Sequence, residues 1–274
     1  MSSSLARPIR VVYFAGPYLE PAARRFVAML ERHPDIDLVL GLCEGEGAGF
    51  GHRFRNLWRR RGWLAVAVLG LEWFEAAVAF LRAPQETLAA RRDARPALAR
   101  FETVHDVHAT EVIARLRALA PDLGVIYGGP ILKPEVFEIP VLGTLGIHHG
   151  RAPQYRGKKT TFWEVYNGER AAGIIIQRLN RGLDAGDVVR MAEVEIGRKG
   201  YSRVWREAQR AGCEAFLAAV LDVKRGVATY TPQDPAVPPG PLCCQPAARD
   251  ILKLALRRLT GRPLARTRRT ATGS

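Results

Sequence analysis

Short apolar runs and helically spaced apolar positions alternate along the first forty residues. Arg10–Ala15 is a short β-rich run, which predicts a buried strand that ends at Gly16-Pro17. The segment Glu20–Arg32 has apolar residues at helical spacing, namely Ala23, Phe26, Val27 and Leu30. Ile36–Leu42 is a second apolar run of strand length. A strand, a helix and a strand in this order predict a parallel pair with a right-handed crossover, and therefore an α/β fold.

The same alternation continues through the rest of the chain. A β-like segment begins at Val104. The elements predicted after it are a helix at Ala109–Leu119, strands at Asp122–Tyr127, Leu142–His148, Ala172–Leu179 and Asp187–Val194, and a long amphipathic helix at Tyr201–Lys224. Residues 8–230 are therefore expected to form one domain, with a Rossmann-like, mostly parallel sheet flanked by helices. Residues 231–274 are expected to add a proline-rich strap and a short basic helix at Ala248–Leu259.

Residues 53–100 interrupt this pattern and are expected to form a helical insertion. An Arg- and Trp-rich lead-in runs into a mostly apolar stretch that includes Glu72 and Glu75. Because two carboxylates inside a bilayer are costly, we exclude a membrane-spanning helix. Two interpretations stay open: a helix packed on the domain or at a homodimer contact, and a helix over residues 53–81 on an anionic membrane surface. The preceding Gly45–Gly51 segment lacks a G-K-[ST] sequence, so we interpret it as a loop.

The chain is strongly basic, with 41 Lys and Arg against 27 Asp and Glu among 274 residues, a formal net charge of +14. This balance points to nucleic acid, an anionic membrane surface or a phosphorylated substrate. Half of the excess lies in residues 251–274, which contain seven basic residues and no acid. Because the sequence contains no helix-turn-helix, zinc-finger or RNA-recognition motif, we do not expect nucleic acid as a partner.

The cysteines and the N-terminal residues indicate in which cellular compartment the protein is expected. Cys43, Cys213, Cys243 and Cys244 are too few for a disulfide scaffold, and they lack the C-x-x-C pairing with nearby histidines of a zinc site. We therefore expect no metal. The polar first residues lead directly into a predicted strand, so we expect no secretory signal. These features favour a cytoplasmic protein, peripheral to the inner membrane face if the insertion lies on lipid.

Two polar residues stand where predicted strands run into glycine-rich loops. His148 closes a strand and enters a Gly- and Pro-rich loop, and Asp184 lies in the turn L-D-A-G-D between two β-like segments. Loops at the carboxyl ends of parallel strands are where α/β enzymes bind ligands. A carboxylate beside an imidazole orients the ring and stabilises its charged form. This pair is therefore a candidate for general acid–base catalysis.

Several motifs follow one another in order around this pair. They are Ile147-His148, then Ala152-Pro153-Gln154-Tyr155-Arg156-Gly157, then Leu183-Asp184-Ala185-Gly186. The series resembles the formyltransferases that use 10-formyltetrahydrofolate as donor, which carry Asn-x-His, L-P-x-Y-x-G and a Leu-Asp-x-Gly turn in this order. The segment from Pro121 to Val136 resembles the family's folate pocket. The resemblance covers residues 9–52 and 101–230.

This resemblance implies transfer of a formyl group from 10-formyltetrahydrofolate to an acceptor amine. The family's Asn and His stabilise the tetrahedral oxyanion and handle the proton, and its Asp tunes the His. Carried over by position, His148 is the general acid/base and Asp184 its partner. The positions that match the folate pocket are Ile131, Leu132, Gly146, Leu179, Asn180 and Asp184.

Position 146 departs from the family pattern, because Gly146 stands where the family has Asn. Glycine has no side-chain amide, and loss of one oxyanion donor typically costs about 10²–10³ in rate. His149, Lys158 and Thr160 lie in the following loop, and Lys158 has the charge and the reach to substitute as a catalytic group. The other interpretation of Gly146 is a catalytically impaired protein that binds folate or a partner.

The surrounding sequence bears on the acceptor. Methionyl-tRNA formyltransferases append a β-barrel domain, for which the 44 residues after Tyr230 are expected to be too few. Glycinamide ribonucleotide formyltransferases carry Gly-Ser-Asn after the first strand, where this chain has Gly16-Pro17-Tyr18. The chain resembles the sugar-nucleotide N-formyltransferases better. This implies a small amine as acceptor, on an amino sugar nucleotide or a lipid-linked glycan precursor, with methionyl-tRNA formyltransferase-like activity as the alternative.

Overall fold

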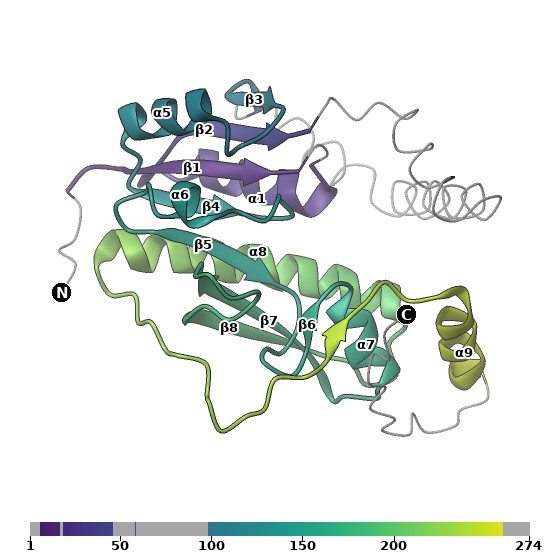
Figure 1. Ribbon diagram of the computed structural model, residues 1–274. Helices are drawn as coiled ribbons and strands as arrows, with labels where there is room; N and C mark the ends of the chain where they lie inside the picture. The colour runs from purple at the N-terminus through teal and green to yellow at the C-terminus, as the bar shows by residue number, and fades with distance from the viewer. Residues whose placement is uncertain (1–5, 17–18, 46–57, 59–97, 260–274) are drawn as a thin grey trace.

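Seven strands form one sheet in the order β3-β2-β1-β4-β5-β7-β8 (Figure 1). Neighbouring strands pair in parallel from β3 to β5, whereas β7 and β8 run antiparallel to their neighbours. The bounds of the strands are β1 Ile9–Ala15, β2 Ile36–Glu44, β3 Phe101–Val104, β4 Leu123–Ile126, β5 Thr144–His148, β7 Ala171–Arg178 and β8 Val188–Glu195. The sheet is therefore mostly parallel and Rossmann-like, as the sequence predicts.

The computed structural model describes residues 6–16, 19–45, 58 and 98–259. Most of the predicted glycine-rich loop lies outside these residues. So does nearly all of the predicted insertion, including the segment 53–81 proposed to meet a membrane. Among the helices that are described, none is long and apolar enough to cross a bilayer.

Helices cover both faces of the sheet. The helices α1 (Pro21–Arg32) and α8 (Tyr201–Arg225) pack on one face, where the rings of Phe26 and Phe216 stack with centroids 4.4 Å apart. The helices α5 (Thr110–Leu119) and α6 (Pro134–Phe137) pack on the other face. Because side chains alternate along a strand, β1 sends Val11 and Tyr13 to the first core and Val12 and Phe14 to the second.

A third apolar cluster lies against β7, the end of β8 and the first turns of α8. The helix α7 (Thr160–Tyr166) contributes Phe162, Val165 and Tyr166, which pack against β7 and the first turns of α8. Leu254 of α9 (Ala248–Leu259) joins the same cluster. The C-terminal helix predicted from the sequence is therefore present, and it is attached to the domain through α7.

The proline-rich strap runs along the domain between α8 and α9. Its first contact is a bridge between Thr231 and Val188. Near its other end is the two-residue strand β9 (Leu242–Cys243), which pairs in parallel with β6 (Arg156–Gly157). Between them the N–H of Gly240 donates to the carbonyl of Pro153 at 2.9 Å. The strap therefore closes over the loop that follows His148 (Figure 1).

The prediction that a β-like segment begins at Val104 is wrong, because Val104 is the last residue of β3. β3 starts at Phe101, where it pairs with Gly41 of β2. After Val104 the chain leaves the sheet, and the Glu44 carboxylate accepts the N–H of Val107 at 3.0 Å. The side chain of Glu44, the last residue of β2, therefore binds the segment that follows β3.

Candidate functional site

His148 and Asp184 lie in contact. Nδ1 of His148 is 3.3 Å from Oδ1 of Asp184, with the two side chains 8% and 15% exposed. Strand direction does not explain this meeting, because β7 is antiparallel to β5 and its last residue, Arg178, pairs with Leu145 near the start of β5. The loop between β7 and β8 brings Asp184 to the ring.

The backbone conformation and two hydrogen bonds hold Asp184 in place. Its backbone has a left-handed φ of 51°, a conformation that Asp tolerates better than most residues. Its Oδ2 accepts the N–H of Gly157 at 2.9 Å, and its main-chain carbonyl accepts the Gln233 amide at 2.8 Å. Burial acts to raise the pKa of Asp184, but the hydrogen bond and charge of His148 and the Gly157 N–H outweigh it and lower that pKa. The residue is therefore held as an anion.

The second ring nitrogen of His148 faces the loop that follows it. Nε2 donates to the carbonyl oxygen of Tyr155 at 2.8 Å. Both ring nitrogens thus face oxygen atoms, Nδ1 the Asp184 carboxylate and Nε2 the Tyr155 carbonyl. A Cβ on Gly150 would lie 2.8 Å from Nε2, so a side chain at that position would press on the ring.

Glu164 lies beneath the same loop and was not predicted as a site residue. It is fully buried, and its Oε1 accepts the N–H groups of Arg151 at 2.9 Å and Gly173 at 3.0 Å. Burial raises the pKa of Glu164 to about 7, although these N–H groups and the charges of Arg151 and His148 act to lower it. The only signal in the sequence is an acid within the apolar helical run T-T-F-W-E-V-Y.

Gln233 of the strap is the other residue that the sequence did not reveal. Its amide donates to the carbonyls of Asp184 and Gly186, at 2.8 and 3.1 Å, and to Oε1 of Gln177 at 3.3 Å. A glutamine among prolines carries no pattern that predicts such contacts. The strap therefore contacts the site at two places: Gln233 binds the turn that carries Asp184, and β9 pairs with Gly157.

The space beside Gly146, where the family has an asparagine side chain, is occupied by another residue. A Cβ there would lie 2.8 Å from Cδ1 of Leu179 and 3.2 Å from Cγ2 of Ile126. Leu179 therefore fills the space that an asparagine at 146 would enter. Gly146 and Leu179 therefore lie side by side.

Two of the three residues named as substitutes for the missing amide are engaged elsewhere. His149 points to the opposite face of the sheet from His148, where its ring centroid lies 5.0 Å from that of Trp205 on α8. Burial lowers the pKa of His149 to about 3. Thr160 is buried, and its hydroxyl donates to the His149 carbonyl. The suggestion that either supplies the missing donor is therefore wrong, whereas the side chain of Lys158 is exposed and stays a candidate.

The remaining positions that the sequence predicts for a folate pocket differ in exposure. Leu132 is buried in the same apolar cluster that Leu179 packs against. Ile131 is 80% exposed beside it. Asn180 is exposed and bonded within its own loop, donating to the carbonyl of Ala185 at 2.8 Å and accepting the N–H of Gly182 at 2.9 Å. Its side chain therefore shapes the turn that carries Asp184.

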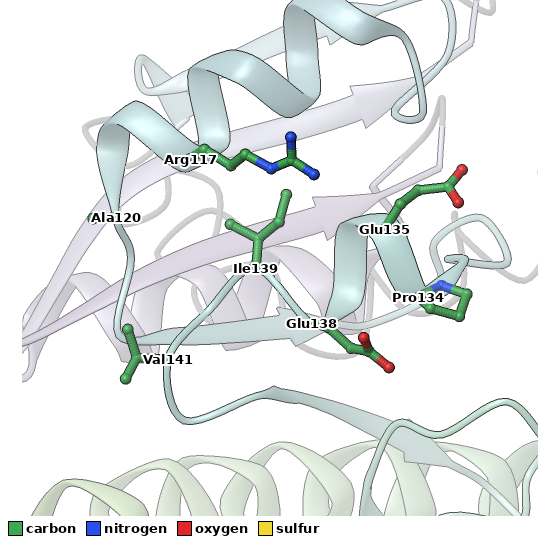
Figure 2. A pocket seen from close by; sticks show the side chains of 7 residues that line it. All are labelled: Arg117, Ala120, Pro134, Glu135, Glu138, Ile139 and Val141. Carbon is green, nitrogen blue, oxygen red and sulfur yellow. The ribbon is translucent and has the colours of Figure 1, made fainter.

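A surface pocket of about 370 Å³ lies away from this site (Figure 2). It opens between the end of α5 and the segment that follows α6. Its lining residues are Arg117, Ala120, Pro134, Glu135, Glu138, Ile139 and Val141. None of the predicted site residues is among them.

A group with metal-binding side chains also lies outside the site. Ligand atoms of Glu44, Asp106 and His108 are within 4.8 Å of one another. Both ring nitrogens of His108 are hydrogen-bonded, Nδ1 to Asp106 at 3.0 Å and Nε2 to the N–H of Lys133 at 3.1 Å. The cluster therefore ties the loop after β3 to the segment before α6.

Residues 81–219 match the family model of formyl transferases. A methionyl-tRNA formyltransferase of Synechococcus sp. (strain JA-3-3Ab) is 34% identical over 127 residues, which are 45% of this chain and 39% of that protein. The chain thus spans about two fifths of the length of the curated relatives that it matches first.

Solved structures share the fold at low sequence identity. A phosphoribosylglycinamide formyltransferase from Anaplasma phagocytophilum superposes with a TM-score of 0.56 at 13% identity, over 80% of this chain and 89% of that one. A sugar N-formyltransferase from a Shewanella species gives 0.55 at 14% identity, over 92% and 88%. The family match spans half of the chain and includes His148 and Asp184. The chain belongs to the formyl transferase family.

Proposed function

We propose that this chain transfers a formyl group from 10-formyltetrahydrofolate to an amine. The observation that carries the proposal is the His148–Asp184 contact of 3.3 Å inside the segment that matches the family. Membership of the family supports the reaction class. The ring and carboxylate supply the acid–base chemistry that the transfer needs.

The roles of the two residues follow from their partners. In the transfer the formyl carbon would form a bond to the acceptor nitrogen and its bond to the donor nitrogen would break, so the acceptor amine must lose a proton and the released donor nitrogen must gain one. Nε2 of His148 is the nitrogen placed to handle that proton, because its present partner is a main-chain carbonyl that a substrate group can replace. Asp184 on Nδ1 orients the ring and stabilises its charged form. Tyr155 and Glu164 hold the loop around the ring through the Tyr155 carbonyl and the Glu164 carboxylate.

The residues present fit a flat, partly polar donor. Leu132 and Leu179 offer an apolar floor, and Ile131 offers an exposed apolar rim. The turn from Leu179 to Asp184 would form the facing wall. These residues would hold the folate ring, as the family resemblance implies for their positions.

For the acceptor we propose a small amine, in particular that of an amino sugar nucleotide or glycan precursor. The basic character of the chain suits a substrate that carries phosphates. A sugar N-formyltransferase is among the structures that share the fold. The methionyl-tRNA formyltransferases among the relatives support the other acceptor. An acceptor panel with both classes decides between them.

Gly146 favours a second candidate function, a folate-binding protein with impaired transfer. No side-chain amide extends from position 146, Leu179 occupies the space, and His149 and Thr160 are engaged elsewhere. In this case the chain would bind the donor and fail to transfer its formyl group to any amine.

Calorimetric titration with a non-hydrolysable 10-formyltetrahydrofolate analogue tests both candidates. We expect the wild-type chain to bind it with micromolar affinity, and His148→Ala to bind within a few-fold of wild type. The same proteins are then assayed for formyl transfer to amino sugar nucleotides and to methionyl-tRNA. Binding with transfer supports the enzyme, and binding without transfer supports the second candidate. Absence of binding would overturn both.

A further inference from the structure

The helix α9 has two faces with different surroundings. Leu254 is 5% exposed in the cluster with Phe162 and Tyr166, and the Arg257 guanidinium lies 5.1 Å from the Tyr166 ring centroid. Asp250, the helix's acid, is also 5% exposed, and its carboxylate accepts the N–H of Ala247. The three residues follow one another at helical spacing, and Leu254 and Arg257 fix α9 to α7.

The outward face of α9 is apolar. Its exposed side chains are Ile251 at 50%, Leu252 at 61% and Leu256 at 52%. At 3.6 residues per turn they share one arc with Ala255, which is also exposed. Figure 1 shows α9 at the periphery of the described chain, beyond α7 and away from the sheet. Apolar side chains gathered in this way mark an interaction surface.

The charges around this face decide which partner it suits. Arg249 and Lys253 are exposed and border the apolar arc, whereas the acid Asp250 lies on the inward face. The sequence after α9 adds four arginines and no acid. An apolar arc with a basic border is the pattern of a helix that lies in the plane of an anionic lipid surface. A second copy of this chain would instead bring basic side chains against basic side chains.

We propose that α9 binds an anionic phospholipid surface, with Ile251 and Leu252 in the headgroup boundary and Arg249 and Lys253 against the phosphates. The attachment through Leu254 and Arg257 would carry the whole domain to that surface. The proposal rests on the described α9 and not on the insertion, which is a separate candidate for the same surface. It also does not depend on the transfer reaction, because binding to vesicles is measured without substrate.

Vesicle co-sedimentation of the full chain tests the proposal. We expect binding to phosphatidylcholine vesicles that contain one third phosphatidylglycerol, and at least roughly tenfold weaker binding to phosphatidylcholine alone, since each basic residue near the surface contributes about fivefold. The double variant Ile251→Asp/Leu252→Asp is expected to reduce the partition coefficient at least roughly tenfold. Arg249→Glu/Lys253→Glu is expected to remove most of the preference for the anionic lipid.

Val227→Asp is the matched control, because Val227 is 63% exposed at the end of α8, outside α9. It should bind vesicles as the wild type does, and all variants should keep the wild-type circular dichroism. Wild-type binding that the α9 variants leave unchanged would assign lipid binding to another segment and overturn the proposal. No vesicle binding, with a dimer that Ile251→Asp/Leu252→Asp converts to a monomer, would assign the face to a second copy and also overturn it.

Discussion

The side-chain amide of Gln233 donates to the main-chain carbonyl of Asp184 at 2.8 Å, across 49 residues of chain. The same amide also donates to the carbonyl of Gly186 at 3.1 Å. A residue of the strap thus fixes the left-handed turn that presents the carboxylate to His148. The strap is therefore part of what positions the site, in addition to linking the domain to α9.

Gln233→Ala should lower kcat by roughly tenfold, because one or two hydrogen bonds worth about 1 kcal/mol each would no longer hold the Asp184 turn. The affinity for the donor should change less than kcat. Steady-state kinetics with varied donor check this. Gln245→Ala is the control, since Gln245 is an exposed glutamine of the same segment. Equal kinetics for the two variants would show that the strap has no such role.

Asp184→Asn should reduce kcat by about 10²–10⁴, because the amide cannot stabilise the charged imidazole. It should also flatten the loss of stability in acid. The pKa of Asp184 is lowered by folding, so its contribution is present above the unfolded-state pKa and is lost as the pH falls through the folded-state value. Unfolding midpoints measured downward from about pH 6 test this. If the exposed Asp234→Asn gave the same flattening, the assignment to Asp184 would fail.

Glu164→Gln should remove a loss of stability at rising pH. The pKa of Glu164 is about 7 in the folded protein, against 4.5 for the ordinary group, so the folded state binds more protons between these values. Stability therefore falls as the pH rises through this window, by up to about 3 kcal/mol. The variant keeps an oxygen for the N–H groups of Arg151 and Gly173 and has no charge to bury.

Urea unfolding at about pH 5 and about pH 8 measures this difference. The wild type should lose stability between the two, and Glu164→Gln should change little. Glu193→Gln is a matched control, because Glu193 is 51% exposed and pairs with the side chain of Arg151. A pH dependence of Glu164→Gln as steep as that of the wild type would contradict a buried, proton-binding Glu164.

Gly146→Asn should destabilise the fold by about 1–3 kcal/mol, because its Cβ would approach Leu179 at 2.8 Å. Adding Leu179→Ala should recover part of this loss by freeing the space. If the missing amide limits the rate, the double variant should transfer faster than Leu179→Ala alone, by up to about 10²-fold. Denaturation and transfer assays on the three variants test both statements. No recovery in the double variant would mean that another contact excludes the asparagine.

The sequence predicted most of the longer strands and helices because each carries its own apolar period, but it did not predict the short helices α6 and α7. It also named the residues of the His148–Asp184 pair, but the reason it gave for their meeting was incomplete. Both loops were treated as following parallel strands, whereas β7 runs antiparallel to β5. The contact depends on the path of the loop between β7 and β8, which local patterns do not encode.

Glu164 and Gln233 could not be predicted for the same physical reason. Their partners are main-chain groups of Arg151, Gly173 and Asp184, which come near only after the sheet, α7 and the strap have packed. The proposed role of His149 failed because its ring packs against Trp205 of α8, although His149 directly follows the last residue of β5. Knowledge of where β5 ends would have separated His148 from His149.

In the proposed reaction His148 handles the proton through Nε2 while Asp184 orients the ring through Nδ1. Single-turnover transfer from formyl-labelled 10-formyltetrahydrofolate to a panel of amines, with wild type and His148→Ala side by side, tests this most directly. We predict labelled product with at least one amine for the wild type, and a rate about 10²–10⁴ lower for His148→Ala at unchanged donor affinity. Equal rates for the two proteins would contradict the role of His148 in proton transfer. Donor bound without any labelled product would contradict the proposed formyl transfer.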